Sequence, residues 1–230
     1  MPQTLTFFVT LRSPYSYLAA ERIAQIVAKS GVQLDFRPVY PLAIRNPEFF
    51  SKANPALLSY LRRDAERVAV MNEIRFSWPN PDPVVQDLDT GEIADHQPYI
   101  YRLTRLCAAA CRSGEGFECH RRLSALLFSG TPGWHTGDQL AAAMSHAGLD
   151  YSMLDQMVRD DPHQLDAELG QNAELQKSLG HWGTPMVHVA GETFFGQDRL
   201  DMCVWHMIRQ GLLPAGADRA LQKEPDSDIS

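Results

Sequence analysis

The opening stretch of this chain constrains its fold more than any other. An apolar segment at residues 5–9 runs into Ser13-Pro14, after which apolar residues recur at helical spacing up to Gly31. Ser13 is suited to the N-cap of a helix, Pro14 to its first position and Gly31 to its end. Residues 32–40 then alternate between apolar and polar side chains, which predicts a second strand. Strand, helix and strand in this order predict a parallel βαβ unit with a right-handed crossover.

Strand character returns only near the end of the chain. Before that point the sequence predicts a series of helices, at residues 56–71, 99–111, 117–128, 136–146, 151–158 and 165–179. Residues 186–189 and 193–195 predict an antiparallel hairpin, and residues 199–210 predict a closing helix. The order βαβ, helices, ββα predicts an α/β fold, namely a thioredoxin-like four-stranded mixed sheet with a large inserted all-helical domain.

This order also predicts where the domains begin and end. The thioredoxin-like domain is discontinuous, with residues 1–40 and 181–215, and the inserted helical domain takes residues 41–180. Residues 216–230 are polar and include the run Glu-Pro-Asp-Ser-Asp, which is typical of a flexible tail.

Charge and cysteine content narrow the classes of partner. A formal net charge of -7 argues against nucleic acid or an anionic membrane as the main partner. No apolar run approaches the roughly 20 residues of a membrane span, and the N-terminus lacks the pattern of a secretory signal. We therefore expect a cytoplasmic protein with reduced thiols. Cys107, Cys111 and Cys119 match no zinc spacing, so we expect free thiols and no metal site.

Ser13 is either a plain helix cap or part of a reactive site. The start of a helix carries partial positive charge, which stabilises an anion or a thiolate. Redox sites of the thioredoxin type need thiols at this turn, but Ser13 and Ser16 carry hydroxyls, which cannot exchange a disulfide. A hydroxyl can donate to a thiolate that a ligand supplies, and each unit of lowered thiol pKa corresponds to about 1.4 kcal/mol. The motif is suited to activating a ligand's thiol near neutral pH.

Two later turns hold further candidates. In Gly183-Thr184-Pro185 the proline can begin a strand in the trans form, or adopt the cis form of about 5–6% of X–Pro bonds. The flanking Gly183 and the order of the motifs favour cis, which would turn the Thr184 backbone toward the start of the first helix. Asp198 can cap the last helix or bind a ligand, whereas Gln197 has no capping role and is the better binding candidate.

Together these motifs resemble those of the 2-hydroxychromene-2-carboxylate isomerases and the related kappa-class glutathione transferases. Both groups belong to the DsbA-like branch of the thioredoxin superfamily. The likeness runs in order over residues 5–210, and its matching stretches are residues 7–19, 60–69, 183–185 and 194–200. The Ser-Pro-Tyr-Ser motif at residues 13–16 and the Phe-Gly-Gln-Asp-Arg motif at residues 195–199 are specific as a pair.

The resemblance implies that glutathione is the cofactor. Ser13 would lie beside the glutathione sulfur, and the Thr184 backbone, ahead of a cis Pro185, would pair with the cysteinyl part. Gln197 and Asp198 would hold the γ-glutamyl end.

Asn54 also matches the family, and the chain differs from the family motifs at two positions. Asn54 falls near a family asparagine that lines the site. A family lysine shortly before the tyrosine that matches Tyr60 is absent, because the chain has Leu57-Leu58-Ser59 there. The Val-Pro of the family is Thr184-Pro185 here.

The resemblance implies a glutathione-dependent isomerase that acts on a small aromatic carboxylate and forms a homodimer. In such enzymes the thiolate adds to the ring carbon beside the oxygen, the ring opens, a bond rotates and the thiol is eliminated. Three alternatives stay open: a kappa-like glutathione transferase or peroxidase, a non-catalytic thioredoxin-fold binding protein, and a dithiol oxidoreductase. The last is the least favoured, because neither Ser13 nor Ser16 can form a disulfide.

Overall fold

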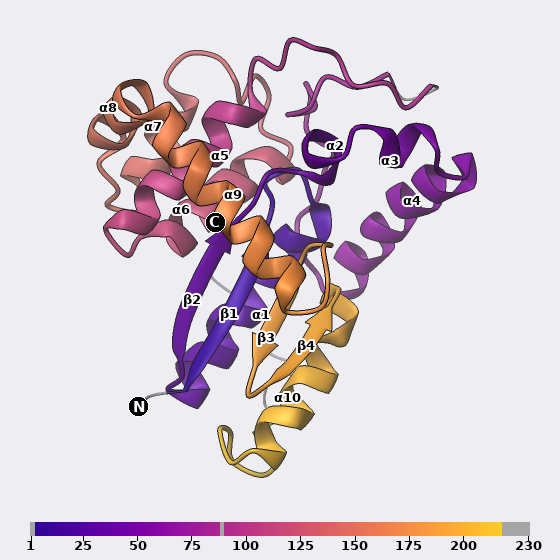
Figure 1. Ribbon diagram of the computed structural model, residues 1–230, viewed down its shortest axis with the longest axis vertical. Coiled ribbons are helices and arrows are strands. Elements are labelled where there is room, and N and C mark those ends of the chain that lie inside the picture. Colours follow the sequence, from indigo (N-terminus) through magenta and orange to yellow (C-terminus); the bar gives the residue numbers. More distant parts are fainter. Residues whose placement is uncertain (1–2, 88–89, 218–230) are drawn as a thin grey trace.

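A computed structural model describes residues 3–87 and 90–217 of the chain. At its centre lies a four-stranded mixed sheet with the strand order β2-β1-β3-β4 (Figure 1). β1 (Thr4–Val9) is parallel to β2 (Gln33–Pro38) and antiparallel to β3 (Met186–Val189). β3 in turn is antiparallel to β4 (Glu192–Phe195). The predicted mixed sheet, including its hairpin, is confirmed.

Helix α1 (Pro14–Ser30) connects the two parallel strands and has the caps that its sequence predicts. The hydroxyl of Ser13 accepts from the amide of Ser16 at 3.2 Å. Gly31 ends the helix with a φ of 68°, and its amide donates to the carbonyl of Val27 at 3.1 Å. A residue without a Cβ suits this left-handed conformation, so the sequence fixes both ends of α1.

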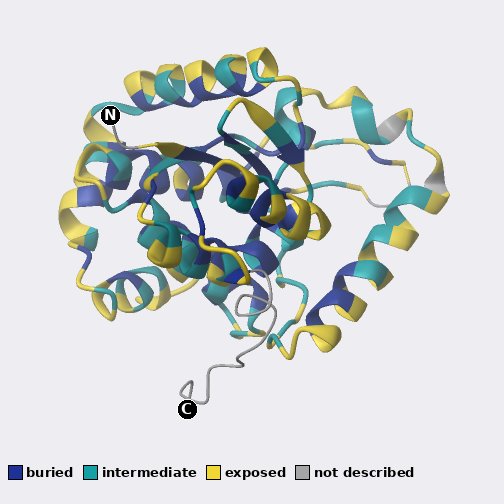
Figure 2. Cartoon of the chain, turned by 90° about the horizontal axis from the view of Figure 1, so that it is seen from below, coloured by how far each residue is buried: buried dark blue, intermediate teal, exposed yellow. Residues whose placement is uncertain are grey.

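Successive side chains of β1 point to opposite sides of the sheet. Helices cover both faces. On one face α1 and α10 (Leu200–Arg209) pack over a cluster that includes Phe7, Ile23, Val187 and Val204. On the other face α9 (Pro162–Ser178) covers a cluster with Phe8 and Met186. Figure 1 shows α9 crossing in front of the strands and α1 behind them. In Figure 2 the buried residues gather on the inward faces of the surrounding helices.

The predicted helices between the two halves of the sheet are present. They are α4 (Pro55–Met71), α5 (Ile100–Arg112), α6 (Gly116–Phe128), α7 (Gln139–Ser145), α8 (Tyr151–Asp160) and α9. α7 begins later than predicted, because the Thr136 hydroxyl donates to the carbonyl of Gly133 within a turn instead of capping a helix. A second core lies among α5 to α9 and contains Leu103, Leu123, Trp134, Leu154 and Leu165.

Two short helices, α2 (Leu42–Arg45) and α3 (Glu48–Ser51), were not predicted. Each follows a proline in a stretch too short to show helical periodicity, so its sequence carried no signal. Within residues 3–87 and 90–217, no helix is long and apolar enough to cross a bilayer. The predicted tail, residues 216–230, lies outside the described residues from position 218 onward.

Candidate functional site

The start of α1 and the turn before β3 meet at one place. The Thr184–Pro185 peptide bond is cis, as expected. The Ser13 hydroxyl lies 3.5 Å from the carbonyl oxygen of Thr184, to which it can donate. In the described part of the chain, the amide N–H of Thr184 has no protein partner. The Ser13 hydroxyl, the unpartnered amide of Thr184 and the weakly hydrogen-bonded carbonyl of Thr184 therefore lie near the N-terminus of α1. The partial positive charge of this helix end stabilises an anion.

A third element, the 3-10 turn η1 (Gln197–Arg199), packs against α1. It is anchored to the proline turn by the amide of Gly196, which donates to the carbonyl of Pro185 at 2.9 Å. Burial and a hydrogen bond to Asp64 raise the pKa of Tyr15, and the nearby charge of Asp198 adds to this shift. Asp198 is thus near enough to the first turn of α1 for its charge to act on Tyr15.

The structure corrects the role of Asp198 and gives Asn54 a role as a helix cap. Asp198 does not cap α10, which begins at Leu200 without a side-chain cap; its carboxylate instead accepts from Arg199 at 2.7 Å. The capping prediction is wrong because the intervening 3-10 turn moves the helix start beyond Asp198. Asn54 caps α4 by accepting from the amide of Ala56 at 2.9 Å. No described interaction joins Asn54 to Ser13.

Gln197 fits the expectation that it is available for binding. Its side chain is half-buried, and within the described residues it has no hydrogen-bonding partner. The structure therefore brings Ser13, Thr184, Pro185 and the Gln197–Arg199 turn together and leaves Asn54 at the start of α4.

Two contacts that hold this site in place were not expected from the sequence. The Tyr15 hydroxyl donates to Asp64 on α4 at 2.7 Å, in a region of contact between α1 and α4. Arg12 donates to both carboxylate oxygens of Asp82 at 3.0 and 3.1 Å and to Gln86 at 2.6 Å. These partners are far apart in the chain, so only the folded structure brings them together.

The site has no thiol of its own. The four cysteines are free, and Cys107 and Cys119 are completely buried with their sulfurs 3.7 Å apart. Burial raises the pKa of Cys111 and of Cys203 to about 12, which keeps both protonated at neutral pH. A sulfur nucleophile at Ser13 would have to come with a ligand. Among the described residues, no three His, Cys, Asp or Glu side chains are grouped to hold a metal ion.

A substitution at Gly183 tests how tightly the proline turn is packed. A Cβ at this position would lie 2.4 Å from the ring of Phe195 and 2.9 Å from that of His181, which stack at 4.0 Å. We expect Gly183→Ala to lower the free energy of unfolding by about 1–3 kcal/mol, as overpacking does. Gly170→Ala on α9 is the control, because no atom lies within 4 Å of its Cβ. Its expected effect is a gain of about 1 kcal/mol. Urea unfolding measures both, and equal stability of Gly183→Ala and wild type would contradict the packing.

A mixed β2-β1-β3-β4 sheet with a cis proline beside the start of α1 defines a protein of the thioredoxin fold. The model of the DSBA-like thioredoxin domain matches residues 4–207, so this chain belongs to that family. It is also similar to a 2-hydroxychromene-2-carboxylate isomerase from Sphingobium xenophagum. The two are 24% identical over 90% of this chain and 100% of that protein.

Solved structures share the same fold. A 2-hydroxychromene-2-carboxylate isomerase superposes with a TM-score of 0.69 at 15% identity, over 96% of this chain and 100% of that one. The cytosolic disulfide reductase DsbM from Pseudomonas aeruginosa, in a structure with GSH, gives a TM-score of 0.57 at 15% identity. That match covers 90% of this chain and 99% of the reductase.

Proposed function

We propose that this protein is a glutathione-dependent isomerase of 2-hydroxychromene-2-carboxylate-type compounds. The observation that carries the proposal is the Ser13 hydroxyl, which lies at the start of α1 within 3.5 Å of the turn that contains cis Pro185. Similarity to an isomerase over 90% of this chain supports the reaction type. The hydroxyls of Ser13 and Ser16 argue against disulfide exchange, as do the chain's own thiols, three of which are buried and the fourth half-buried.

The described residues fit a glutathione molecule bound with its sulfur at Ser13. The open amide and the carbonyl of Thr184 match the donor and acceptor of a peptide backbone, such as that of the cysteinyl residue. The γ-glutamyl end carries an ammonium and a carboxylate, for which Asp198 and the unpartnered amide of Gln197 supply the complementary groups. By family resemblance, Asn54 would line the site as well.

Bound glutathione would supply the thiol that adds to the ring carbon beside the oxygen and leaves after the opened chain has rotated. The Ser13 hydroxyl would donate a hydrogen bond to the thiolate form. The hydroxyl proton is available because its present acceptor, the carbonyl of Thr184, is at the long limit of a hydrogen bond. The positive end of α1 would add to the stabilisation of the anion. The half-buried Tyr15, whose pKa is raised, stays neutral and holds α4 in place through Asp64.

Turnover with and without glutathione tests the proposal. We expect isomerisation of 2-hydroxychromene-2-carboxylate only when glutathione is present, with the thiol fully recovered afterwards. Consumption of glutathione with an aryl halide or a hydroperoxide, and no isomerisation, would favour a transferase or peroxidase instead. Absence of glutathione binding in calorimetry would favour a non-catalytic binding protein. The homodimer and the cytoplasmic location stay predictions, of which sedimentation tests the first.

One substitution tests the part of the site formed by η1. We expect Asp198→Asn to weaken glutathione binding about tenfold, because a charge-assisted hydrogen bond to the γ-glutamyl ammonium is lost. Asp201→Asn is the matched control, since Asp201 lies one turn further on and is exposed in an ion pair with Arg22. Calorimetric titration measures both, and equal dissociation constants for the two variants would remove Asp198 from the binding site.

A further inference from the structure

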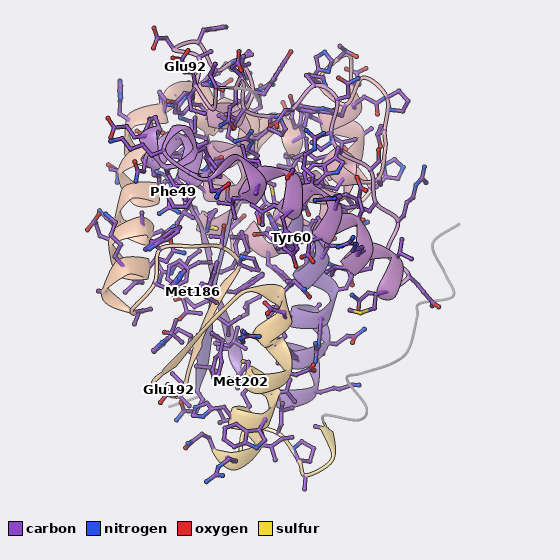
Figure 3. The ribbon with its side chains drawn as sticks, turned by 90° about the vertical axis from the view of Figure 1, so that its right-hand side faces the viewer. Phe49, Tyr60, Glu92, Met186, Glu192 and Met202 are labelled. Atoms are coloured by element: carbon purple, nitrogen blue, oxygen red, sulfur yellow. The ribbon has the colours of Figure 1, made fainter. Side chains whose placement is uncertain are left out.

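An open pocket of about 710 Å³ lies beside the proline turn, between the α2–α3 segment and α9. Its walls contain aromatic rings, aliphatic groups and charged groups, contributed by Tyr40, Leu42, Arg45, Phe49, Leu169 and Trp182 among others. Figure 3 shows Phe49 beside the ribbon of α9, above Met186 at the start of β3. Ser13 and Thr184 do not line this pocket, so it is separate from the candidate thiol site.

Arg45 is the distinctive polar group of this pocket. Its guanidinium donates to the carbonyl of Tyr40 at 2.7 Å, to that of Trp182 at 2.9 Å and to the side-chain oxygen of Gln176 at 3.4 Å. All three acceptors are neutral, and the guanidinium has more N–H donors than these bonds use. Within the described residues, Arg45 forms no ion pair with any carboxylate. Burial lowers the pKa of its guanidinium.

The acidic side chains around the pocket already have cationic partners. Asp166 accepts two bonds from Arg105, at 2.8 and 2.7 Å, and another from the hydroxyl of Tyr40 at 2.5 Å. Glu174 pairs with Lys177 at 2.6 Å. Arg45 is therefore the uncompensated charge of the lining. A half-buried cation without a counter-ion is costly unless a bound anion pairs with it.

The rings decide which anion fits. Phe49 and Trp182 meet edge to face with centroids 5.2 Å apart, and both line the pocket with Arg45. Trp182 is 43% exposed, which leaves part of its surface open to a ligand. A planar guanidinium recognises a carboxylate through parallel hydrogen bonds, and aromatic walls favour a flat apolar group.

We propose that this pocket binds an aromatic monocarboxylate, with its carboxylate paired to Arg45 and its ring against Phe49 and Trp182. The site is new relative to the glutathione site, and the identity of its natural ligand, an acid substrate or product of the isomerase, rests on the proposed function. Because Arg45 holds the carbonyl of Trp182, the pocket and Thr184 share one turn of the chain. The binding itself requires neither glutathione nor turnover.

Calorimetry with benzoate, in the absence of glutathione, tests the proposal. We expect saturable binding of benzoate and none of neutral benzamide, which has the same ring. Arg45→Gln keeps a side-chain donor for the turn and should weaken benzoate binding about tenfold or more, because the charge is lost. Phe49→Ala leaves every described bond of Arg45 in place and should weaken binding by about 3- to 10-fold through lost ring contact.

The control is Arg62→Gln, which removes an exposed arginine on α4 that lies over the ring of Trp78. It should bind benzoate as the wild type does. Circular dichroism confirms that each variant is folded. Failure of the wild type to bind benzoate, equal binding of benzamide, or wild-type affinity in both Arg45→Gln and Phe49→Ala would overturn the proposal. None of these outcomes depends on thiol chemistry, so they are distinct from a failure of the isomerase assignment.

Discussion

Replacement of Ser13 by alanine is expected to lower kcat/KM for glutathione-dependent isomerisation by about 10- to 100-fold. A hydrogen bond to a charged group contributes about 1.5–3 kcal/mol, and the alanine variant loses the donor to the thiolate. The same change removes the N-cap of α1, whose hydroxyl accepts from Ser16 at 3.2 Å. It should therefore also cost about 1 kcal/mol of stability. The pKa of bound glutathione, followed by thiolate absorbance, should rise in parallel.

Two variants separate the chemical role of Ser13 from its capping role. Ser13→Asp keeps a good cap, so its stability should stay close to that of the wild type, but its charge repels a thiolate and should abolish turnover. Asp150→Ala removes the cap of α8, where the carboxylate accepts from Met153 at 3.0 Å, and so matches the stability loss away from the site. Its activity should be unchanged. If Ser13→Asp turned over substrate at the wild-type rate, Ser13 would be only a cap.

A buried histidine is expected to make the fold sensitive to acid. His120 on α6 is fully buried, and its ring lies 5.6 Å from that of Phe36. The backbone of Ser16 is near enough to favour the charged ring slightly, but within the described residues no group completes a hydrogen bond with either ring nitrogen. Desolvation dominates and lowers the pKa of His120 to about 4. The imidazole is therefore neutral in the folded protein at neutral pH.

The sign of the effect follows from proton binding in the two states. Below a pH of about 6.5 the unfolded chain takes up a proton at this histidine, while the folded chain does so only near pH 4. Folding stability therefore falls as the pH drops through this window, by about 3 kcal/mol from this group. Above the window the contribution is constant.

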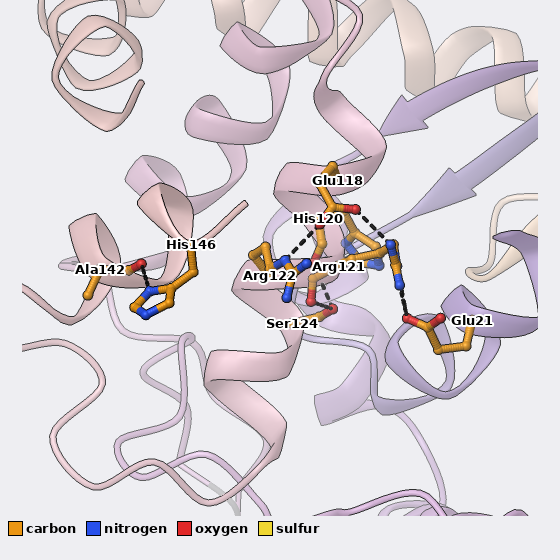
Figure 4. Close-up of polar contacts among 8 residues, drawn as sticks. All are labelled: Glu21, Glu118, His120, Arg121, Arg122, Ser124, Ala142 and His146. Atoms are coloured by element: carbon orange, nitrogen blue, oxygen red, sulfur yellow. Dashed lines mark hydrogen bonds and ion pairs between the residues drawn. The ribbon is translucent and has the colours of Figure 1, made fainter. Parts of the chain in front are cut away.

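His120→Leu should remove this part of the acid sensitivity and relieve two unpaired ring nitrogens. The control is His146→Leu, since His146 is exposed and bonds to the carbonyl of Ala142 within its own helix (Figure 4). Figure 4 also shows two ion pairs of Arg121, one with Glu118 within α6 and one with Glu21, which ties α6 to α1. Urea unfolding between about pH 7.5 and 4.5 measures the slopes. Identical slopes in His120→Leu and wild type would contradict a neutral buried histidine.

Helix ends and strands were well predicted where the cause is local. Ser13, Pro14 and Gly31 specify the ends of α1 through their own hydroxyl, ring and missing Cβ, and the structure has them in these roles. The hairpin of β3 and β4 followed from alternation and an intervening turn. Local prediction failed at Asp198, because a 3-10 turn and a helix start have similar sequences and differ only in how the chain packs.

By itself, the sequence determined the mixed sheet, the capped first helix and the absence of a thiol at its start, because each depends on neighbouring residues or residue type. Only the tertiary structure decided that Thr184 meets Ser13 and that Arg45 forms no ion pair within the described residues. Arg45 was visible as a single basic residue in an apolar run, but its partners Gln176 and Trp182 lie far along the chain. Charge balance in a pocket is a property of contacts between distant segments, and no local pattern records it.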